Sequence, residues 1–468
     1  MSPSNRSVDP ADGRRALGDA AAGAPEGRRA RAPSVGGPGI WTEAQAESRL
    51  RSLELFGMRF GLDRMRRMMT ALGSPEQSFE AVHVLGTNGK SSTTRMIAAI
   101  LERHGLRTGA YLSPHLVSYR ERVRVGEREL ATEAFAASIA RASWAAERVN
   151  RTLAEDDHVT QFELLTAAAL WQMAEQRVDV AVVEAGLGGR YDATSVIEAG
   201  VTVLTNVGLE HTRWLGPTIK DIAEEKLAVV MPDAKLVLGA GLPEAAMAVA
   251  ERVARERGAH IVRPGAGEPG LALLARGAFQ RTNFAVARAA AAAHLERARI
   301  ALSEEAVLAA AAATEVPGRL QLLDGEPPTI LDGAHNRDAV DALVASLPEV
   351  LGDGPLALVL GVLEDKDAVG MLGVLLPLCE RAWFTAPPSS RALSPGALQS
   401  LARQLGFQDS ACEPRLAQAL AQARSWARER GGSVLATGSV YLVGDLLAQI
   451  DRSGTLSAPG PHPRGSSR

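Results

Sequence analysis

The sequence predicts an α/β protein built on parallel β-sheets. Short runs of β-branched and other apolar residues alternate along the chain with longer segments rich in Ala, Leu and Arg. Several runs are almost continuously apolar, as expected for parallel strands that are buried on both faces. Such alternation is typical of strands connected by helical crossovers. We expect a P-loop-containing parallel-sheet N-terminal domain and a smaller Rossmann-like α/β C-terminal domain.

The expected elements follow in chain order. The strands are Ala81–Leu85, Thr108–Leu112, Val178–Glu184, Val201–Val207, Lys235–Gly239, Thr329–Leu331, Leu356–Leu360, Ala382–Ala386 and Ser433–Thr437. Helices expected between them include Thr93–His104, Glu163–Glu175 and Phe284–Arg297. The alanine runs Ala289–Ala293 and Ala309–Ala313 also favour helix, because alanine has the highest intrinsic helix propensity.

The domain division is expected near Val316-Pro317-Gly318-Arg319, after the helical stretch Glu304–Thr314 and before a fresh strand–helix series. This places the N-terminal domain at residues 40–315 and the C-terminal domain at residues 316–452. Residues 1–39 and 453–468 are rich in small residues, Pro and Arg, and we expect both to be disordered extensions.

The composition excludes several classes of protein. The chain has 468 residues and a formal net charge of -3, which gives no indication of a nucleic-acid or membrane-surface partner. Its 2 cysteines, Cys379 and Cys412, exclude a disulfide framework and favour a reducing compartment. No apolar run is long enough to cross a bilayer. We therefore expect a cytoplasmic protein, and a monomer.

The strongest motif is Gly86-Thr87-Asn88-Gly89-Lys90-Ser91-Ser92, which follows an expected strand and opens an expected helix. Glycines let backbone N–H groups turn towards phosphate oxygens, and the helix N-terminus adds its positive dipole end. Lys90 would reach the β- and γ-phosphates, with a hydroxyl of Ser91 or Ser92 near Mg²⁺. The strict P-loop pattern is not met, because Val84 stands where its first glycine belongs. The alternative is a glycine-rich turn at a helix start.

The chain resembles the Mur ligase superfamily at this loop, because a strand runs into GTNGK followed by a hydroxyl residue. The segments Tyr111-Leu112-Ser113-Pro114-His115-Leu116 and Arg120-Glu121-Arg122-Val123 resemble its folylpolyglutamate/dihydrofolate synthase branch. The resemblance covers roughly residues 43–447. It implies small-molecule substrates: ATP, L-glutamate and a dihydropteroate or folate carboxylate.

Two strand ends carry polar residues among glycines: Glu184 before Gly186-Leu187-Gly188-Gly189, and His211 after the strand at 201–207. A carboxylate at the carboxyl end of a parallel strand points into the ligand crevice. The resemblance implies that Ser113, Glu184 and His211 bind Mg²⁺. Oxygen ligands suit this ion, whereas a histidine is unusual for it.

Lys226 aligns with a lysine that is carbamoylated in the family. Carbon dioxide reacts with a neutral amine, so the site should lower the pKa of this lysine. From the residues alone, Lys226 beside Glu224 and Glu225 reads as a surface lysine on a helix. The following Leu227-Ala228-Val229 departs from the family's usual Ala-Gly-Ile.

The C-terminal half carries further matches. Gln280 and Asn283 match a motif that the family uses near the nucleotide, although Phe279 replaces its histidine. Arg319 matches an arginine that contacts ATP phosphates, a role that suits a bidentate guanidinium, and an interdomain ion pair is the alternative. Asp332 is implied to contact the nucleotide, and His335 to lie near the reacting groups.

The segments Asp365-Lys366-Asp367, Ser390-Arg391-Ala392 and Thr437-Gly438-Ser439 match the family as well, and Ser439 is expected near glutamate. Thr160 and Phe162 lie in a segment resembling the part of bifunctional members beside the pterin. The chain departs from the family pattern at Glu210 and at Arg337, where a proline is usual.

The implied reaction transfers the γ-phosphoryl group of ATP to the acceptor carboxylate, and the glutamate amine then displaces phosphate. Catalysis would be mostly positioning and charge neutralisation, with Lys90, Lys226 and His335 as catalytic residues and Arg319 contributing from the second domain. A bifunctional enzyme, using dihydropteroate and reduced folates, is favoured. The alternatives are folylpolyglutamate synthesis alone, a Mur-type ligase with another carboxylate substrate, and a P-loop NTPase switch.

Overall fold

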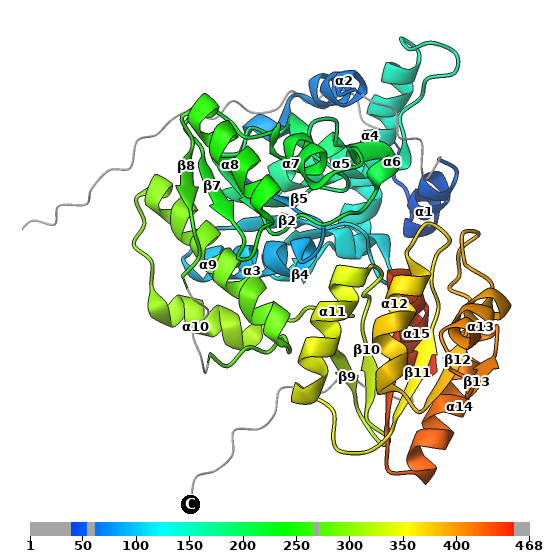
Figure 1. Ribbon diagram of the computed structural model, residues 1–468. Coiled ribbons are helices and arrows are strands. Elements are labelled where there is room, and N and C mark those ends of the chain that lie inside the picture. Colours follow the sequence, from blue (N-terminus) through cyan, green and yellow to red (C-terminus); the bar gives the residue numbers. More distant parts are fainter. Residues whose placement is uncertain (1–38, 54–60, 266–270, 454–468) are drawn as a thin grey trace, which may run out of the picture. The chain divides into compact units, whose positions relative to one another are not determined.

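The computed structural model describes residues 39–53, 61–265 and 271–453, which form two β-sheets covered by helices (Figure 1). The first is an 8-stranded sheet in the order β4-β3-β2-β5-β1-β6-β7-β8, and the second a 6-stranded sheet in the order β13-β12-β11-β14-β10-β9. Strands β3 and β4 are antiparallel at one edge of the first sheet, and β9 is antiparallel at an edge of the second. The other neighbours run parallel, so the predicted fold class is confirmed.

The strands of the first sheet are β1 (Glu80–Leu85), β2 (Thr108–Tyr111), β3 (Val123–Val125), β4 (Arg128–Glu129), β5 (Val180–Glu184), β6 (Val201–Leu204), β7 (Lys235–Leu238) and β8 (His260–Val262). Those of the second are β9 (Gln321–Leu323), β10 (Thr329–Leu331), β11 (Leu356–Leu360), β12 (Arg381–Phe384), β13 (Ser410–Cys412) and β14 (Ser433–Thr437).

The helices before the second sheet are α1 (Glu43–Arg51), α2 (Asp63–Leu72), α3 (Lys90–Arg103), α4 (Thr132–Asn150), α5 (Gln161–Glu175), α6 (Thr212–Leu215), α7 (Ile219–Leu227), α8 (Glu244–Arg257), α9 (Ala278–Ala298) and α10 (Glu304–Ala313). Those that follow are α11 (Arg337–Ser346), α12 (Ala368–Leu375), α13 (Pro395–Gln404), α14 (Leu416–Glu429) and α15 (Val440–Ser453). Short 3-10 helices are η1 (Pro75–Gln77), η2 (Tyr119–Arg122), η3 (Ala193–Val196), η4 (Leu347–Glu349) and η5 (Leu376–Leu378).

Every expected strand is present, and the observed ends differ from the expected ones by a few residues. The sequence did not predict β3, β4, β8, β9 or β13. Each of these strands is only 2 or 3 residues long; β4, β8, β9 and β13 lie at the edges of the sheets, and β3 lies one strand in, between β4 and β2. Edge strands are partly exposed and need no continuous apolar run, so they leave little pattern to recognise.

Alternating burial fixes the first sheet between two helical layers. Along β5, Ala181 and Val183 pack in a cluster with residues of α4 and α5, whereas Val180 and Val182 pack in another with residues of α3 and α9. All 5 residues of this strand are buried, which explains its unbroken apolar run. The second sheet is covered in the same way, by α11, α12 and α13 on one face and by α14 and α15 on the other.

This topology brings the chemical motifs to one edge of the first sheet. Because β1 lies between β5 and β6, the carboxyl ends of these three strands lie side by side. They carry Glu184 as the last residue of β5, the loop at 86–89 after β1 and the stretch at 205–211 after β6. Ligands of open α/β sheets bind at such carboxyl ends. The sheet order alone therefore places the phosphate loop beside Glu184 and His211.

The segment between α10 and β9 connects the two sheets, and the predicted domain boundary at residues 315 and 316 falls within it. That boundary stays a prediction. The two predicted terminal extensions lie outside the described residues, except for Gly39 and Ser453. Within the described ranges, no helix is both long and apolar enough to span a membrane.

Candidate functional site

One cavity of about 400 Å³ collects most of the predicted site residues from both sheets. Its lining includes Thr87, Asn88, Gly89, Lys90, Ser91, Ser92, Ser113, Glu184, His211, Asn283, Arg319, Asp332, His335 and Ser439. The predicted residues that do not line it are Gly86, Thr160, Phe162 and Lys226. Residues more than 200 positions apart in the sequence thus face one space.

The phosphate loop needs its glycines for steric reasons. Gly89 begins α3 with φ of 78°, and a β-carbon there would lie 2.5 Å from Asn283 Oδ1. Gly86 has φ of 149°, and a β-carbon there would lie 1.9 Å from Thr205 Oγ1. Both backbone conformations are in the region that favours glycine. The loop therefore approaches Thr205 and Asn283 too closely for any side chain at these two positions.

Asn206 fixes the first part of this loop, at Thr87 and Asn88, through hydrogen bonds. Its Oδ1 accepts hydrogen bonds from the backbone N–H groups of Thr87 (3.0 Å) and Asn88 (2.8 Å). These two N–H groups are consequently occupied by the protein. Gly89 has no side chain with which to cap α3, so the N–H groups of the first helical turn are the ones left for an anion. The sequence did not identify Asn206 as part of the site.

Glu184 is a buried carboxylate that lines the cavity. It is 1% exposed, and it accepts hydrogen bonds from Ser91 Oγ (2.9 Å) and from the backbone N–H of Ser113 (3.1 Å). Burial raises the pKa of Glu184, and the positive charge of Lys90 opposes that rise. A carboxylate in this situation favours a nearby cation.

The predicted Mg²⁺ ligands fit such an ion in their chemistry. Ser113 and Glu184 supply oxygen atoms, and partial burial, the first of several influences, lowers the pKa of His211 to about 4. The imidazole is then neutral at physiological pH, as a metal ligand must be. In the part of the chain that the structure describes, no three His, Cys, Asp or Glu side chains cluster as metal ligands, so the predicted set depends on the serine.

Lys226 lies behind the phosphate loop and not on a surface. It is 4% exposed on α7, and its Nζ donates a hydrogen bond to the carbonyl oxygen of Gly86 (2.9 Å). Burial, followed by the positive charge of Lys90, lowers the pKa of Lys226 to about 7. A large share of this amine is therefore neutral near pH 7, which is the form that reacts with carbon dioxide.

The second sheet contributes Arg319, Asp332 and His335. Both oxygens of Asp332 accept backbone N–H groups, from Leu320 (2.7 Å) and Ala334 (2.7 Å), so this buried carboxylate shapes the loop after β10. Burial raises the pKa of Asp332, and the charge of Arg319 opposes the rise. His335 Nδ1 lies 2.8 Å from the carbonyl oxygen of Gly333, so this nitrogen carries the hydrogen and Nε2 faces the cavity side.

Asn283 lies on α9 opposite the phosphate loop. Its Nδ2 donates a hydrogen bond to Oε1 of the buried Gln280 (3.0 Å), which fixes the direction of the Asn283 amide. Phe279, which replaces the family's histidine, also lines the cavity. The matched helix thus faces the predicted nucleotide site with one amide and one aromatic ring.

The predicted substrate residues have different environments. The Phe162 ring packs against Gly186, because a β-carbon on Gly186 would lie only 2.5 Å from Cζ of Phe162. Gly186 lines the cavity. Ser439 also lines it and accepts a hydrogen bond from the backbone N–H of Tyr441 (3.2 Å). Thr160 caps α5, where its hydroxyl accepts the backbone N–H of Glu163 (3.3 Å). This cap is a structural role, and a substrate contact for Thr160 stays a prediction.

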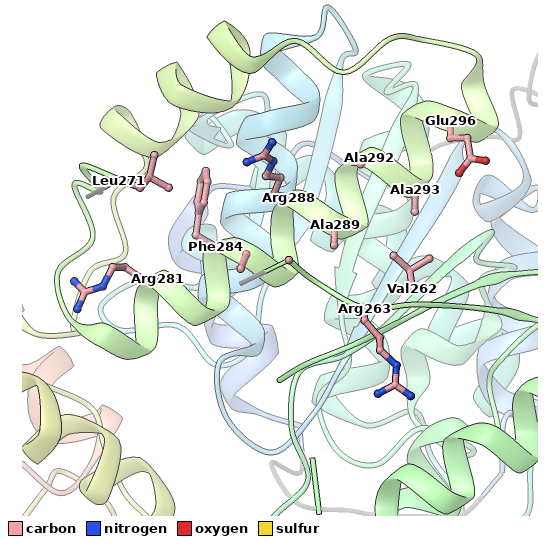
Figure 2. A pocket seen from close by; sticks show the side chains of 12 residues that line it. Val262, Arg263, Leu271, Arg281, Phe284, Arg288, Ala289, Ala292, Ala293 and Glu296 are labelled. Carbon is pink, nitrogen blue, oxygen red and sulfur yellow. The ribbon is translucent and has the colours of Figure 1, made fainter. Parts of the chain in front are cut away.

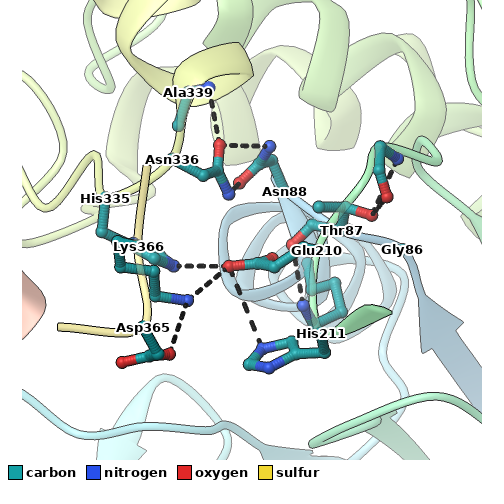
Figure 3. A network of polar contacts seen from close by, with 12 residues as sticks. Gly86, Thr87, Asn88, Glu210, His211, His335, Asn336, Ala339, Asp365 and Lys366 are labelled. Atoms are coloured by element: carbon teal, nitrogen blue, oxygen red, sulfur yellow. Dashed lines mark hydrogen bonds and ion pairs between the residues drawn. The ribbon is translucent and has the colours of Figure 1, made fainter. Parts of the chain in front are cut away.

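Sequence reasoning missed a polar network that joins the two sheets (Figure 3). The carboxylate oxygen Oε1 of Glu210 accepts a hydrogen bond from Lys366 Nζ (2.8 Å) and lies 3.4 Å from His335 Nε2 and 3.9 Å from His211 Nε2. A second link pairs the amides of Asn88 and Asn336. The motif matches at Lys366 and His335 had marked the positions but not the partner that they share.

Two other cavities are larger, but neither is lined by a predicted site residue. The cavity in Figure 2 measures about 490 Å³ and runs along α9, where Arg281 and Arg288 flank Phe284. Both arginines are engaged in ion pairs, with Glu349 and Glu304. Size therefore does not identify the site here, whereas the gathering of polar groups does.

Comparison with known protein families identifies the class of enzyme to which the two domains belong. The Mur ligase middle domain family matches residues 84–237, and the family of the Mur ligase glutamate ligase domain matches residues 318–440. The fold, with two mostly parallel sheets and the phosphate loop of the first facing the second, is thus that of a Mur-type ATP-dependent ligase. The chain belongs to the dihydrofolate synthase/folylpolyglutamate synthase family of ATP-dependent glutamate ligases.

The relatives resemble the chain over most of its length. The dihydrofolate synthase/folylpolyglutamate synthase of Escherichia coli is 33% identical over 87% of this chain and 96% of its own. A probable bifunctional folylpolyglutamate synthase/dihydropteroate synthase of Haloferax volcanii is 34% identical, and the chain spans 50% of that relative's length.

Solved structures of this family have the same fold as this chain. Mycobacterium tuberculosis folylpolyglutamate synthase complexed with ADP has a TM-score of 0.81 at 30% identity, covering 87% of this chain and 98% of that chain. E. coli FolC in complex with DHPP and ADP has a TM-score of 0.77 at 31% identity, covering 89% of this chain and 99% of that chain. The predicted resemblance to this family is confirmed.

Proposed function

We propose that the protein joins L-glutamate to dihydropteroate, to reduced folates, or to both, through an acyl-phosphate intermediate, with release of ADP and phosphate. The observation that carries this proposal is the shared cavity: the phosphate loop after β1 faces Arg319, Asp332 and His335 of the second sheet. An ATP γ-phosphate held at the loop would therefore point towards groups of the other sheet. The relative solved with DHPP and ADP supports the same pair of ligands here.

The nucleotide site is proposed at Gly86, Thr87, Asn88, Gly89, Lys90, Ser91, Ser92, Asn283, Arg319 and Asp332. The first-turn N–H groups of α3 and the Lys90 ammonium would hold the phosphates. Arg319 would neutralise charge from the opposite side with its planar guanidinium. Ser113, Glu184 and His211 would hold Mg²⁺, which when bound would offset the negative charge of the phosphates.

The reaction then needs two displacements. An oxygen of the acceptor carboxylate attacks the γ-phosphorus, and the bond from that phosphorus to ADP breaks. The neutral amine of L-glutamate attacks the acyl carbon, the bond from that carbon to phosphate breaks, and the amine loses a proton as the amide forms. Lys90, Arg319 and His335 stabilise charge during these steps, and closure between the sheets keeps water from the acyl phosphate.

Lys226 is proposed to carry a carbamate. The neutral amine and carbon dioxide would form a nitrogen–carbon bond with loss of one proton, which leaves an anion behind the loop; counted from the ammonium form, two protons are lost. Its lowered pKa and its burial beneath Gly86 support this modification. The ¹³C NMR spectrum of protein equilibrated with ¹³C-bicarbonate should show a carbamate carbon that the Lys226→Met variant lacks. Identical spectra for the two proteins would overturn the assignment.

The acceptor is proposed to lie beside Phe162, with Thr160 as a further predicted contact, and L-glutamate is proposed to lie near Ser439. The test is an assay with MgATP and L-glutamate in which phosphate release and product mass are followed with 7,8-dihydropteroate or tetrahydrofolate. Glutamylated products from both acceptors would establish a bifunctional enzyme. Product from tetrahydrofolate alone would restrict the activity to polyglutamylation. ATP turnover that ignores both acceptors would overturn the proposal and favour another carboxylate substrate or an NTPase switch.

A further inference from the structure

Glu210 occupies a position where the chain departs from its family's pattern, and the predicted mechanism gives it no role. It follows β6, one residue before His211, at the junction of the two sheets. Its side chain is only 11% exposed, and that of Lys366 is 9% exposed. Charged groups this deeply buried are expected to be paired, and this pair crosses from one sheet to the other.

The carboxylate oxygen Oε1 of Glu210 is the shared acceptor of the network. Lys366 Nζ donates to it at 2.8 Å, and His335 Nε2 lies 3.4 Å away (Figure 3). Lys366 Nζ also lies 3.7 Å from Asp365 Oδ2, and Asp365 Oδ1 accepts a hydrogen bond from Arg391 (3.2 Å). All five side chains line the same cavity. One carboxylate of the first sheet thus orients two nitrogen-bearing groups of the second.

We propose that Glu210 is a positioning residue that holds His335 and Lys366 in the geometry required for acyl-phosphate formation. This inference rests on the proposed ligase function and adds to it a residue that joins the two halves of the site. In its imidazolium form His335 is fixed at both nitrogens, because Nδ1 donates to the carbonyl oxygen of Gly333 and the protonated Nε2 pairs with the carboxylate of Glu210. Without the carboxylate, the imidazole and the ammonium lose the atom that fixes their position.

The mechanism of this effect is geometric, because Glu210 need not touch a reacting atom. Misplacing catalytic groups by about 1 Å costs on the order of a hundredfold in rate. Loss of such positioning acts on the transition state, so kcat should fall while KM for ATP changes little. A residue with only a structural role would instead lower stability, and would alter kcat and KM without this split.

The chain offers a matched control. Arg281 of α9 and Glu349 of η4 also form an ion pair between the two parts of the chain, with Nη1 and Oε2 separated by 3.0 Å. Glu349 does not line the cavity. Replacement of Glu349 by glutamine therefore removes a cross-link of the same chemical type without touching the proposed site, and it should leave kcat within about twofold of the wild type.

The experiment measures kcat, KM for ATP and Tm for the wild type, Glu210→Gln, Glu210→Asp and Glu349→Gln, with the acceptor that the wild type uses. We expect kcat of Glu210→Gln to fall about tenfold to a hundredfold, KM for ATP to stay within about twofold, and Glu210→Asp to recover part of the loss. Lys366→Met combined with Glu210→Gln should be little worse than Lys366→Met alone, because both changes break one unit.

The outcomes separate the two levels of inference. A wild type that glutamylates no acceptor contradicts the proposed function. With an active wild type, three results would each overturn the role of Glu210: unchanged kcat in Glu210→Gln, an equal loss in Glu349→Gln, or fully additive effects in the double variant. If Glu210→Gln fails to fold, Glu210→Asp still decides the matter, because a well-folded variant with wild-type kcat and its carboxylate drawn back by one methylene group excludes a precise positioning role.

Discussion

Asn88 of the phosphate loop and Asn336 of the second sheet form a reciprocal amide pair. Asn88 Nδ2 donates to Asn336 Oδ1 at 3.2 Å, and Asn336 Nδ2 donates to Asn88 Oδ1 at 3.0 Å. The same Asn336 Oδ1 accepts the backbone N–H of Ala339 (2.9 Å) and so caps α11. The Asn336 side chain therefore caps α11 and also links this helix to the phosphate loop that follows β1.

These two roles can be separated by substitution. Serine caps a helix about as well as asparagine but is too short to reach Asn88. We expect Asn336→Ser to keep Tm close to that of the wild type while kcat/KM for ATP falls about tenfold, because the loop loses its partner. Asn336→Ala should lose both functions, with a further cost of about 1 kcal/mol in the free energy of unfolding. Equal stability of the two variants in thermal unfolding would contradict this division.

Lys90 is expected to be the most sensitive phosphate ligand. Its Nζ now donates to the carbonyl oxygen of Thr87 (3.0 Å), and it lines the cavity beside Glu184. Lys90→Ala should lower the rate of acceptor-dependent phosphate release by about a hundredfold to a thousandfold, since it removes a charge that stabilises the transition state. Lys235→Ala, at the start of β7 and not part of the cavity lining, serves as the control. An unchanged rate in Lys90→Ala would contradict the ligase mechanism.

Lys226 predicts a dependence of stability on pH with a definite sign. Burial lowers its pKa from 10.5 to about 7, so between these values the unfolded chain binds a proton that the folded protein does not. Stability contributed by this group therefore rises with pH through that window. In carbon-dioxide-free buffer, Tm of the wild type relative to Lys226→Met should increase from about pH 7 to about pH 9. Lys220→Met, exposed on the same helix, should show no such trend.

Two phenylalanines divide the predicted substrate pockets. Phe162 packs against Gly186 and lies 6.2 Å from Tyr111 between ring centroids, whereas Phe279 lines the cavity from α9. We expect Phe162→Ala to raise KM for dihydropteroate about tenfold with little effect on KM for ATP, because an aromatic contact is lost. Phe279→Ala should instead raise KM for ATP with little effect on KM for dihydropteroate. Steady-state kinetics with each substrate varied in turn distinguishes the pair, and parallel changes in both variants would contradict separate pockets.

The sequence predicted the site best where a motif and a strand end coincide. Glu184, His211 and the phosphate loop each follow an apolar run, and the carboxyl ends of parallel strands meet at one edge, so their convergence needed only the fold class. Lys226 is different. Its neighbours in sequence are glutamates, which favour a surface position, and its burial depends on how α7 packs beneath Gly86. That packing is a tertiary fact with no local pattern.

Pairings between distant residues were beyond the sequence for a related reason. Asn206, Glu210 and Lys366 each acquire their role from a partner more than 100 residues away. An asparagine or glutamate after a strand is consistent with a solvated loop, and no periodicity distinguishes it from one that joins two sheets. At Thr160 a local pattern was informative. Its Thr-x-x-Glu sequence specifies the capping box that the structure shows, whereas the substrate contact came from the resemblance alone.

The central place of β1 has a consequence for how the protein is made. The strand that leads into the phosphate loop pairs with β5 and β6, which are synthesised much later, and the loop itself is held by Asn206, 118 residues beyond Asn88. A nascent chain that ends after α3 contains every residue of the motif but neither neighbour of its strand. Because such non-local pairings form only once both partners have left the ribosome, growing chains should acquire affinity for nucleotide abruptly, after β6 and Asn206 have emerged.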